Sequence, residues 1–406
     1  MRMVENLWPL KCLKDISLKI GSGATPRGGK NAYLSEGISL IRSLNVYDFK
    51  FEENGLAFIS SEQADELSNV IVQKDDILLN ITGASVARCC LAEQKYLPAR
   101  VNQHVAIIRV RPDLADARFV LYCINSSRFK SRLLSLAQGG ATREALTKTT
   151  IEEFQVLQPP LPIQQRIAGI LSAYDELIEN SQRRIKLLEA MARALYREWF
   201  VHFRFPGHEN HPRVPSPLGE IPQGWEVKFV KEVATVTYGF PFKSREFQTD
   251  RIGTPVIRIR DILSGSSETF TEEKAEPKYH VKNGHILIGM DGDFHMNIWS
   301  SGHAYQNQRV ARFESKGEIG NFHLFLALEK PIQELNKAIV GTTVAHLGDM
   351  HIKAIQIIFP PKEIRVKASD FLEPLMTQII GFKQQIQTLR RTRDLLLPRL
   401  LSGQID

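Results

Sequence analysis

The sequence predicts an α+β protein with two tandem domains, each followed by a long helix, and the two helices packed as a coiled coil. Three observations support this prediction. The second half of the chain repeats the first, short runs of β-branched residues fill the front of each repeat, and heptads fill the back. Because the repeat is internal, we expect a pseudo-two-fold axis within one chain.

The repeat is visible in matched segments along the chain. LKDI at Leu13 aligns with VKEV at Val230, an offset of 217 residues, and IEEFQVLQPP at Ile151 aligns with IKAIQIIFPP at Ile352, an offset of 201. An offset that drifts in this way is expected when surface loops differ in length. We therefore expect five segments: a first domain over 1–158, a first helix over 159–205, a linker over 206–224, a second domain over 225–359 and a second helix over 360–406.

We expect each domain to be α+β, with a mostly antiparallel sheet and some helix. Runs rich in β-branched and aromatic residues, separated by Gly, Pro and Asn, are typical of strands. The expected strands lie within 38–47, 69–73, 76–82, 104–110 and 154–158, and within 256–262, 285–290, 309–313 and 355–359. Helical patterns cover 118–137 and 322–340.

The heptads run at alternating spacings of three and four residues and occupy the same register in both copies. The first seam is Leu171, Tyr174, Ile178, Ser181, Ile185, Leu188, Ala192, Leu195 and Trp199. The second seam is Leu372, Leu375, Ile379, Phe382, Ile386, Leu389, Arg393 and Leu396. A pattern of this length favours a coiled coil, while a helix lying on the core of its own domain stays an alternative.

Two features connect the halves. Residues 206–224 are rich in Pro and Gly and are expected to form an extended linker. Trp199, Phe200 and Phe203 lie at the end of the first helix. They are expected either to pack in the core of this chain or to anchor the second helix or a partner protein.

Composition and charge indicate the partners and the cellular compartment that we expect for this protein. Lys and Arg number 52 against 45 Asp and Glu, a net charge of +7 that suits a polyanionic partner. Apolar runs such as HVAII are too short to span a bilayer, and the first residues do not resemble a secretory signal. The four cysteines show no disulfide framework. We therefore expect a cytoplasmic protein with reduced thiols.

Sequence motifs for catalysis, phosphate binding and metal binding are weak. GSGATPRGGK at 21–30 lacks the glycine spacing of a phosphate loop, so it is either a cationic turn that meets phosphates or a plain solvated loop. Asp291-Gly292-Asp293 is too short for a calcium loop and aligns with Thr82-Gly83-Ala84. With no zinc spacing and no nucleophile motif either, we expect no catalytic residue, no metal and no cofactor in this chain. An unrecognised, dispersed enzyme site stays an alternative.

The whole arrangement resembles one family. PPLPIQQRIAGIL at Pro159 leads a helix that runs into LYREWF, and LLLPRLLSGQID closes the sequence. With two β-rich domains that differ from each other, these segments make the chain similar to the specificity (S) subunits of type I restriction-modification enzymes.

That resemblance implies a non-catalytic DNA-recognition subunit. Each β-rich domain would be a target-recognition domain that reads one half of a split, asymmetric DNA site. The helices would pack antiparallel, set the gap between the half-sites and dock two modification (M) subunits, which hold S-adenosylmethionine and methylate adenine. Restriction (R) subunits would add ATP- and Mg-dependent translocation and cleavage. The seam from Leu171 to Trp199 spans about 42 Å at about 1.5 Å per residue, comparable to one turn of B-DNA at about 34–36 Å.

Candidate DNA contacts follow from residue type and placement. Phosphates favour Arg, Lys and hydroxyls on loops, and bases favour Arg, Asn, Gln and Lys. The first domain offers Ser22, Thr25, Arg27, Lys30, Arg42, Asn45, Arg88, Asn102, Gln103 and His104. The second offers Lys243, Ser244, Arg245, Arg258, Arg260, Asn307, Gln308 and Arg309.

The repeated Asn-Gln pair has two possible roles. VNQHVA at Val101 aligns with QNQRVA at Gln306, so the same pair precedes a strand in both domains. It either reads DNA or bonds the backbone where each strand begins. Because His104 aligns with Arg309, these divergent residues are better candidates for reading two different half-sites.

A different class of protein is the main alternative. A coiled-coil scaffold whose β-rich domains bind protein or carbohydrate would also show the repeat and the heptads. Steep salt dependence of DNA binding separates the two hypotheses, because it reports the release of counterions from phosphates.

Overall fold

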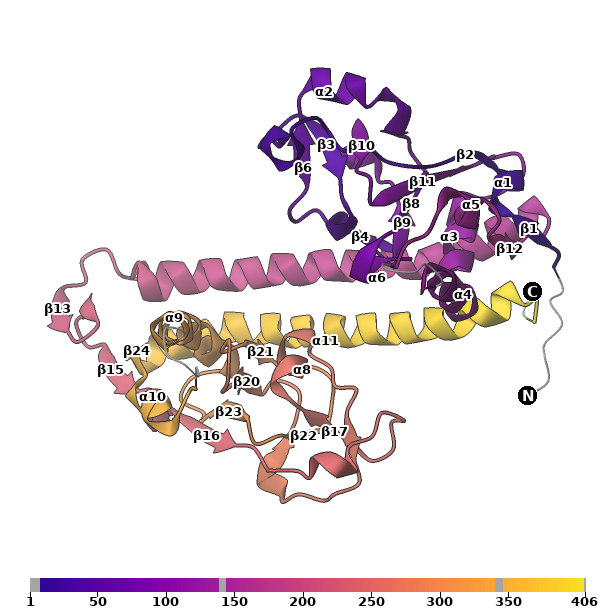
Figure 1. The fold of residues 1–406 in the computed structure, drawn as a ribbon. Helices are drawn as coiled ribbons and strands as arrows, with labels where there is room; N and C mark the ends of the chain where they lie inside the picture. Colours follow the sequence, from indigo (N-terminus) through magenta and orange to yellow (C-terminus); the bar gives the residue numbers. More distant parts are fainter. Residues whose placement is uncertain (1–7, 139–143, 340–345, 405–406) are drawn as a thin grey trace. The chain divides into compact units, whose positions relative to one another are not determined.

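The computed structural model describes residues 8–138, 144–339 and 346–404. The chain forms two compact units, Met1–Glu176 with Leu389–Asp406 and Leu177–Thr388. Each unit therefore combines one β-rich domain with a segment of each long helix (Figure 1). The units are described one at a time.

Over its described residues, the first unit holds two four-stranded sheets and two short strand pairs. One sheet is antiparallel, in the order β2 (Ser17–Ser22), β11 (Val105–Val110), β8 (Ile77–Asn80) and β9 (Cys89–Leu91). The other has the order β6 (Ala57–Ile59), β3 (Ile38–Ile41), β10 (Ala99–Val101) and β7 (Ile71–Val72). The pairs are β1 (Leu10–Cys12) with β12 (Gln155–Leu157) and β4 (Val46–Tyr47) with β5 (Lys50–Phe51). Only β3 and β10 run parallel among these described strands.

The second unit repeats this topology. Its antiparallel sheet has the order β16 (Ala234–Tyr238), β23 (Val310–Ser315), β20 (Ile286–Gly289) and β21 (Met296–Ile298). Its second sheet has the order β18 (Phe270–Thr271), β17 (Thr254–Ile257), β22 (Ala304–Gln306) and β19 (His280–Val281), with β17 and β22 parallel. A β15 (Glu226–Phe229) and β24 (Gln356–Phe359) pair matches β1 and β12. The predicted duplication and mostly antiparallel sheets are confirmed.

The helices of the domains are mostly short. The first unit has α1 (Leu13–Ile16), α2 (Ser61–Glu66), α3 (Ala117–Asn125), α4 (Ser127–Gln138) and α5 (Lys148–Glu152). The second has α7 (Val230–Val233), α8 (Ile259–Ser264), α9 (Asn321–Ile339) and α10 (Asp349–Ala354).

The strand expected over 38–47 is split by a 3₁₀ turn at Ser43–Asn45 into β3 and β4, and two further elements differ from the sequence prediction. The helix expected over 118–137 is broken at Ser126, whose backbone is extended and whose hydroxyl donates to the carbonyl of Cys123 at 2.8 Å. The strand expected over 256–262 ends at Ile257 and continues as α8. There the backbone N–H of Arg258 donates to Asp261 Oδ2 at 2.9 Å. In both places a short polar side chain offers the backbone a local partner, which overrides the apolar pattern.

The predicted linker over 206–224 is more ordered than an extended segment. It contains a hairpin of β13 (Arg213–Ser216) and β14 (Gly219–Pro222). Ile221 is buried in the core of the second unit, as is Trp225 just beyond. The apolar residues near its end hold this segment against the domain.

The long helices are α6 (Leu161–Tyr196), which ends in a π-helical turn over Arg197–Val201, and α11 (Lys362–Leu401). Every predicted seam residue is buried or half-buried. Ser181, the polar seam residue of α6, donates its hydroxyl to the carbonyl of Leu177 at 2.8 Å. The predicted heptad seams are confirmed as packed faces.

Within the second unit the two helices are antiparallel. Arg184 of α6 lies over the ring of Phe382 at 5.5 Å, and Trp199 lies 6.1 Å from the ring of Phe371. Residue numbers therefore rise along α6 as they fall along α11. Seam residues of both helices also join the domain core, so the coiled coil and the core-packed helix are both present in this segment.

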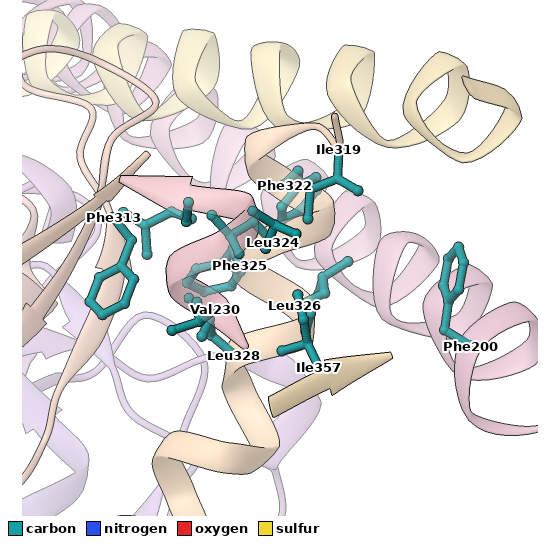
Figure 2. Close-up of a cluster of buried hydrophobic side chains, with 14 of the residues drawn as sticks. Phe200, Val230, Phe313, Ile319, Phe322, Leu324, Phe325, Leu326, Leu328 and Ile357 are labelled. Atoms are coloured by element: carbon teal, nitrogen blue, oxygen red, sulfur yellow. The ribbon is translucent and has the colours of Figure 1, made fainter. Parts of the chain in front are cut away.

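Aromatic residues at the end of α6 complete the core of the second unit. Trp199, Phe200 and Phe203 are buried together with Trp225, and Phe200 lies 5.8 Å from Trp225. Figure 2 shows Phe200 on α6 to one side of the α9 cluster, and its ring lies 4.4 Å from the ring of His323 on α9. Core packing within the chain is therefore observed, and Trp199 also contacts Phe371 of the second helix.

The first unit receives the end of α11 in the same manner. Leu397, Leu400 and Leu401 are buried with Ile167 and Leu171 of α6 in the core of the first domain. The structure also explains the polar residue of the second seam, Arg393 of α11. Arg393 Nη1 pairs with Asp175 Oδ1 at 2.5 Å, and its guanidinium lies 4.6 Å from the ring of Phe49.

Candidate nucleic-acid interface

A close backbone approach holds one loop against one turn in each domain. A Cβ on Gly23 would lie 2.1 Å from the carbonyl oxygen of Val101, so only glycine fits there. A Cβ on Gly239 would lie 1.9 Å from the carbonyl oxygen of Asn307. The loop after each glycine therefore lies beside the turn that follows β10 or β22. This packing brings candidate residues from separate segments together.

Most predicted DNA contacts are accessible. The exposed ones are Ser22, Thr25, Arg27, Lys30, Gln103, Lys243, Ser244, Arg245, Arg260, Gln308 and Arg309. The half-buried ones are Arg42, Arg88, His104, Arg258 and Asn307. The exposed group includes cations on the loop after β2 and on the loop after β16, as a phosphate-contacting surface requires.

Two predicted contacts are buried and bonded to local backbone. Asn45 is fully buried, its Oδ1 accepts from the backbone N–H of Arg42 at 3.0 Å, and its Nδ2 donates to the carbonyl of Glu52 at 2.8 Å. Asn102 is buried, and its Oδ1 accepts from the backbone N–H of His104 at 3.2 Å. Both side chains cap local backbone, the alternative that the sequence left open for Asn102.

Three arginines of the predicted set are held by aromatic rings of their own domain. The guanidinium of Arg42 lies 5.1 Å from the ring of Tyr33, and that of Arg88 lies 4.7 Å from the ring of Tyr47. In the second domain Arg258 lies 5.7 Å from the ring of Phe247. Such contacts orient the guanidinium and leave part of it accessible.

Three residues outside the predicted set, Thr82, Asp291 and His346, contact one another or the divergent turn residues His104 and Arg309. Thr82 Oγ1 lies 2.7 Å from His104 Nδ1. At the matching place in the second domain, Asp291 Oδ2 lies 3.4 Å from Arg309 Nε, and Asp291 Oδ1 lies 2.6 Å from His346 Nδ1. The sequence signal was the alignment of Thr82 with Asp291, which is informative only once both are seen beside the divergent turn residues.

A buried carboxylate, Asp261, accepts a hydrogen bond from the backbone N–H of Arg258 at the start of α8. Burial raises the pKa of Asp261 to about 6. In the first domain the same capping position is held by a neutral amide, Asn45. The folded chain therefore binds a proton at Asp261 more tightly than the unfolded chain does, so stability from this group falls as pH rises from about 4 to about 6.

Asp261→Asn is expected to stabilise the folded chain above pH 6 and to change little near pH 4, because the amide keeps the cap without charge. Two pKa units correspond to about 3 kcal/mol, and solvent screening of this partly buried group reduces the expected gain to about 1 kcal/mol. Arg258 and Arg260 lie 3.8 and 3.9 Å from the Asp261 carboxylate. Urea unfolding at pH 4.5 and pH 7.5 checks this prediction. A variant less stable than wild type at pH 7.5 would show that the ion pairs outweigh the burial.

The described ranges hold no group of three or more side chains suited to a metal ion. In the same ranges, no helix is both long enough and apolar enough to cross a bilayer.

The model of the type I restriction modification DNA specificity domain matches this chain twice, over residues 5–190 and 222–391. The chain belongs to the family of type I restriction-modification specificity subunits. Each copy of the specificity domain spans one β-rich domain and much of the helix that follows it. The β-rich domains are accordingly the DNA-recognition domains of a specificity subunit.

Individual relatives agree with this assignment. The MjaIX specificity subunit of Methanocaldococcus jannaschii is 27% identical over 410 residues, 98% of this chain and 93% of that protein. The EcoBI specificity subunit of Escherichia coli is 32% identical over 193 residues, 46% of this chain and 41% of that protein. The crystal structure of a type I restriction-modification S subunit from M. genitalium has the same fold. Its TM-score is 0.63 at 16% identity, over 98% of this chain and 97% of that one.

Proposed function

We propose that each recognition domain of this specificity subunit reads one half of a bipartite, asymmetric DNA site. One observation carries the proposal: the same fold occurs twice, and equivalent surface positions carry different side chains. His104 in the first domain is replaced by Arg309 in the second, and Thr82 is replaced by Asp291. Identical scaffolds with different polar groups read different base sequences, so the composite site is asymmetric.

We further propose that α6 and α11 set the gap between the half-sites and dock two methyltransferase (M) subunits. An apolar stripe on α6 supports docking, because Leu187 and Met191 lie one turn apart and expose 65% and 58% of their surface. Ala190 and Ala194 extend this stripe. Exposed apolar side chains in a row are typical of a surface that a partner covers.

The repeat of this stripe on α11 is more polar. Counting 201 residues forward places Thr388 and Thr392 where α6 has Leu187 and Met191. The two docking faces are therefore not equivalent, and the two M subunits are expected to bind with different strengths. Methylation with S-adenosylmethionine is assigned to the M subunits. ATP- and Mg-dependent cleavage is assigned to restriction (R) subunits, and the complex acts on cytoplasmic DNA.

Co-expression of this chain with its M subunits, followed by mapping of methylated adenines, tests the proposal. Methylation is expected only within a two-part motif with a constant gap. M subunits expressed without this chain serve as the control and should leave no such motif. Methylation without sequence preference, or methyl transfer by this chain alone, would contradict the proposal.

A further inference from the structure

Thr82 and Asp291 occupy the same place in the two recognition domains. In the first, Asn80 at the end of β8 pairs with Val105 at the start of β11. In the second, Gly289 at the end of β20 pairs with Val310 at the start of β23. Thr82 and Asp291 lie two residues beyond those strand ends, and His104 and Arg309 lie one residue before the following strands. Each pair therefore meets at the same end of the same sheet.

The first pair is a hydrogen-bonded network. Gln103 Nε2 lies 3.1 Å from His104 Nε2. The other ring nitrogen of His104, Nδ1, lies 2.7 Å from Thr82 Oγ1. Gln103 is exposed, and His104 and Thr82 are half-buried, so these three side chains offer hydrogen-bonding groups at the surface.

In the second pair, the Asp291 carboxylate orients the Arg309 guanidinium. Asp291 Oδ2 holds Arg309 at Nε, 3.4 Å away, while the side chain of Arg309 stays 56% exposed. The described residues place no hydrogen-bond partner on its two terminal nitrogens. Asp291 is itself fixed through its other oxygen by His346 Nδ1 at 2.6 Å. A guanidinium held in this way presents its terminal N–H groups as a fork, the shape that fits O6 and N7 of guanine.

A carboxylate beside DNA is costly unless it has a local partner, because phosphates repel it. Asp291 has two such partners, Arg309 and His346. Its place in the interface is therefore best explained by orienting Arg309 and not by contacting DNA.

We propose that Asp291 and Thr82 are positioning residues for base readout, Asp291 for Arg309 reading a guanine and Thr82 for His104 reading a base in the other half-site. This inference rests on the proposed function, since it assumes that the complex methylates a bipartite site. It adds which positions differ between the half-sites and the chemistry by which they differ.

The test maps methylated adenines for the co-expressed complex carrying Asp291→Ala, Asp291→Asn, Arg309→Lys or Thr82→Val. The three changes in the second domain are expected to reduce discrimination at one guanine position by about tenfold, since a bidentate contact contributes about 1–3 kcal/mol. Thr82→Val is expected to relax one position in the other half-site. The gap and all remaining positions should not change.

Glu334→Gln serves as the matched control, because Glu334 is an exposed, ion-paired carboxylate on α9 of the same unit. It should leave the motif intact. A purely structural role for Asp291 would lower methylation equally at all sites and leave the base preference unchanged, which would overturn the inference. If Asp291→Ala lowers the unfolding temperature, the isosteric Asp291→Asn and the charge-preserving Arg309→Lys decide the question.

The outcomes separate the inference from the proposed function. If the wild-type complex yields no bipartite motif, the proposed function fails. If the wild-type motif is bipartite but the Asp291 and Arg309 variants keep it unchanged, the inference alone is refuted.

Discussion

Insertion of one heptad into both α6 and α11 is expected to lengthen the gap between the half-sites while leaving both half-site sequences unchanged. Seven residues add about 10 Å of helix, equivalent to at most about three base pairs at about 3.4 Å each. Three base pairs is an upper limit, because each added base pair also rotates one half-site about the duplex axis relative to the other. The half-sites should persist because the recognition loops lie on the β-rich domains, away from the insertions.

The structure indicates where to place the insertions. Arg184 of α6 lies against Phe382 of α11, so a heptad after Gln182 and another after Gln384 extend both helices near one level of the seam. Methylation mapping then measures the gap directly. Insertion into α6 alone is the control and should abolish site-specific methylation, because the two seams no longer match in length. A gap unchanged by the double insertion would argue against a spacing role for the helices.

Replacement of Leu397 and Leu400 by alanine is expected to unfold the first recognition domain. Both side chains lie near the end of α11, are only 5% and 3% exposed, and belong to the core of the first unit. Each Leu→Ala change in a core costs about 2–5 kcal/mol. Since a domain is stable by about 5–15 kcal/mol, the double variant loses most or all of that stability.

Leu395→Ala is the matched control, because Leu395 is on the same turn of α11 and is 58% exposed. Peptide-resolved hydrogen exchange of the full-length chain should show lost protection in β2, β8 and β11 for the double variant only. Strands β16, β20 and β23 of the second unit should stay protected, because the replaced leucines are outside their core. Equal protection in the double variant and the control would contradict a role of α11 in the first core.

Sequence reasoning was sufficient for features that repeat at a regular period. Heptads identified the faces of α6 and α11 that are buried, and β-branched runs located β8, β11, β20 and β23. These features depend on which residues share one face, and that follows from spacing along a helix or strand. The internal repeat was equally readable, because matched segments survive where loops have diverged.

Individual polar residues were harder to assign. Asn45 and Arg42 both read as DNA contacts, yet Asn45 is buried as a backbone cap while Arg42 lies on a tyrosine ring. An asparagine that caps a turn and one that reads adenine have the same sequence signature. Burial separates them, and burial depends on segments distant in the sequence.

Sequence alone thus specified a duplicated α+β chain with two helical seams, a basic balance and a family resemblance, because period and composition are properties of neighbouring residues. The folded chain was needed to show that α11 completes the core of the first domain and that the end of α6 completes the core of the second. It was also needed to bring Thr82 to His104 and Asp291 to Arg309. These contacts join segments that only strand pairing and core packing bring together, and no local pattern encodes them.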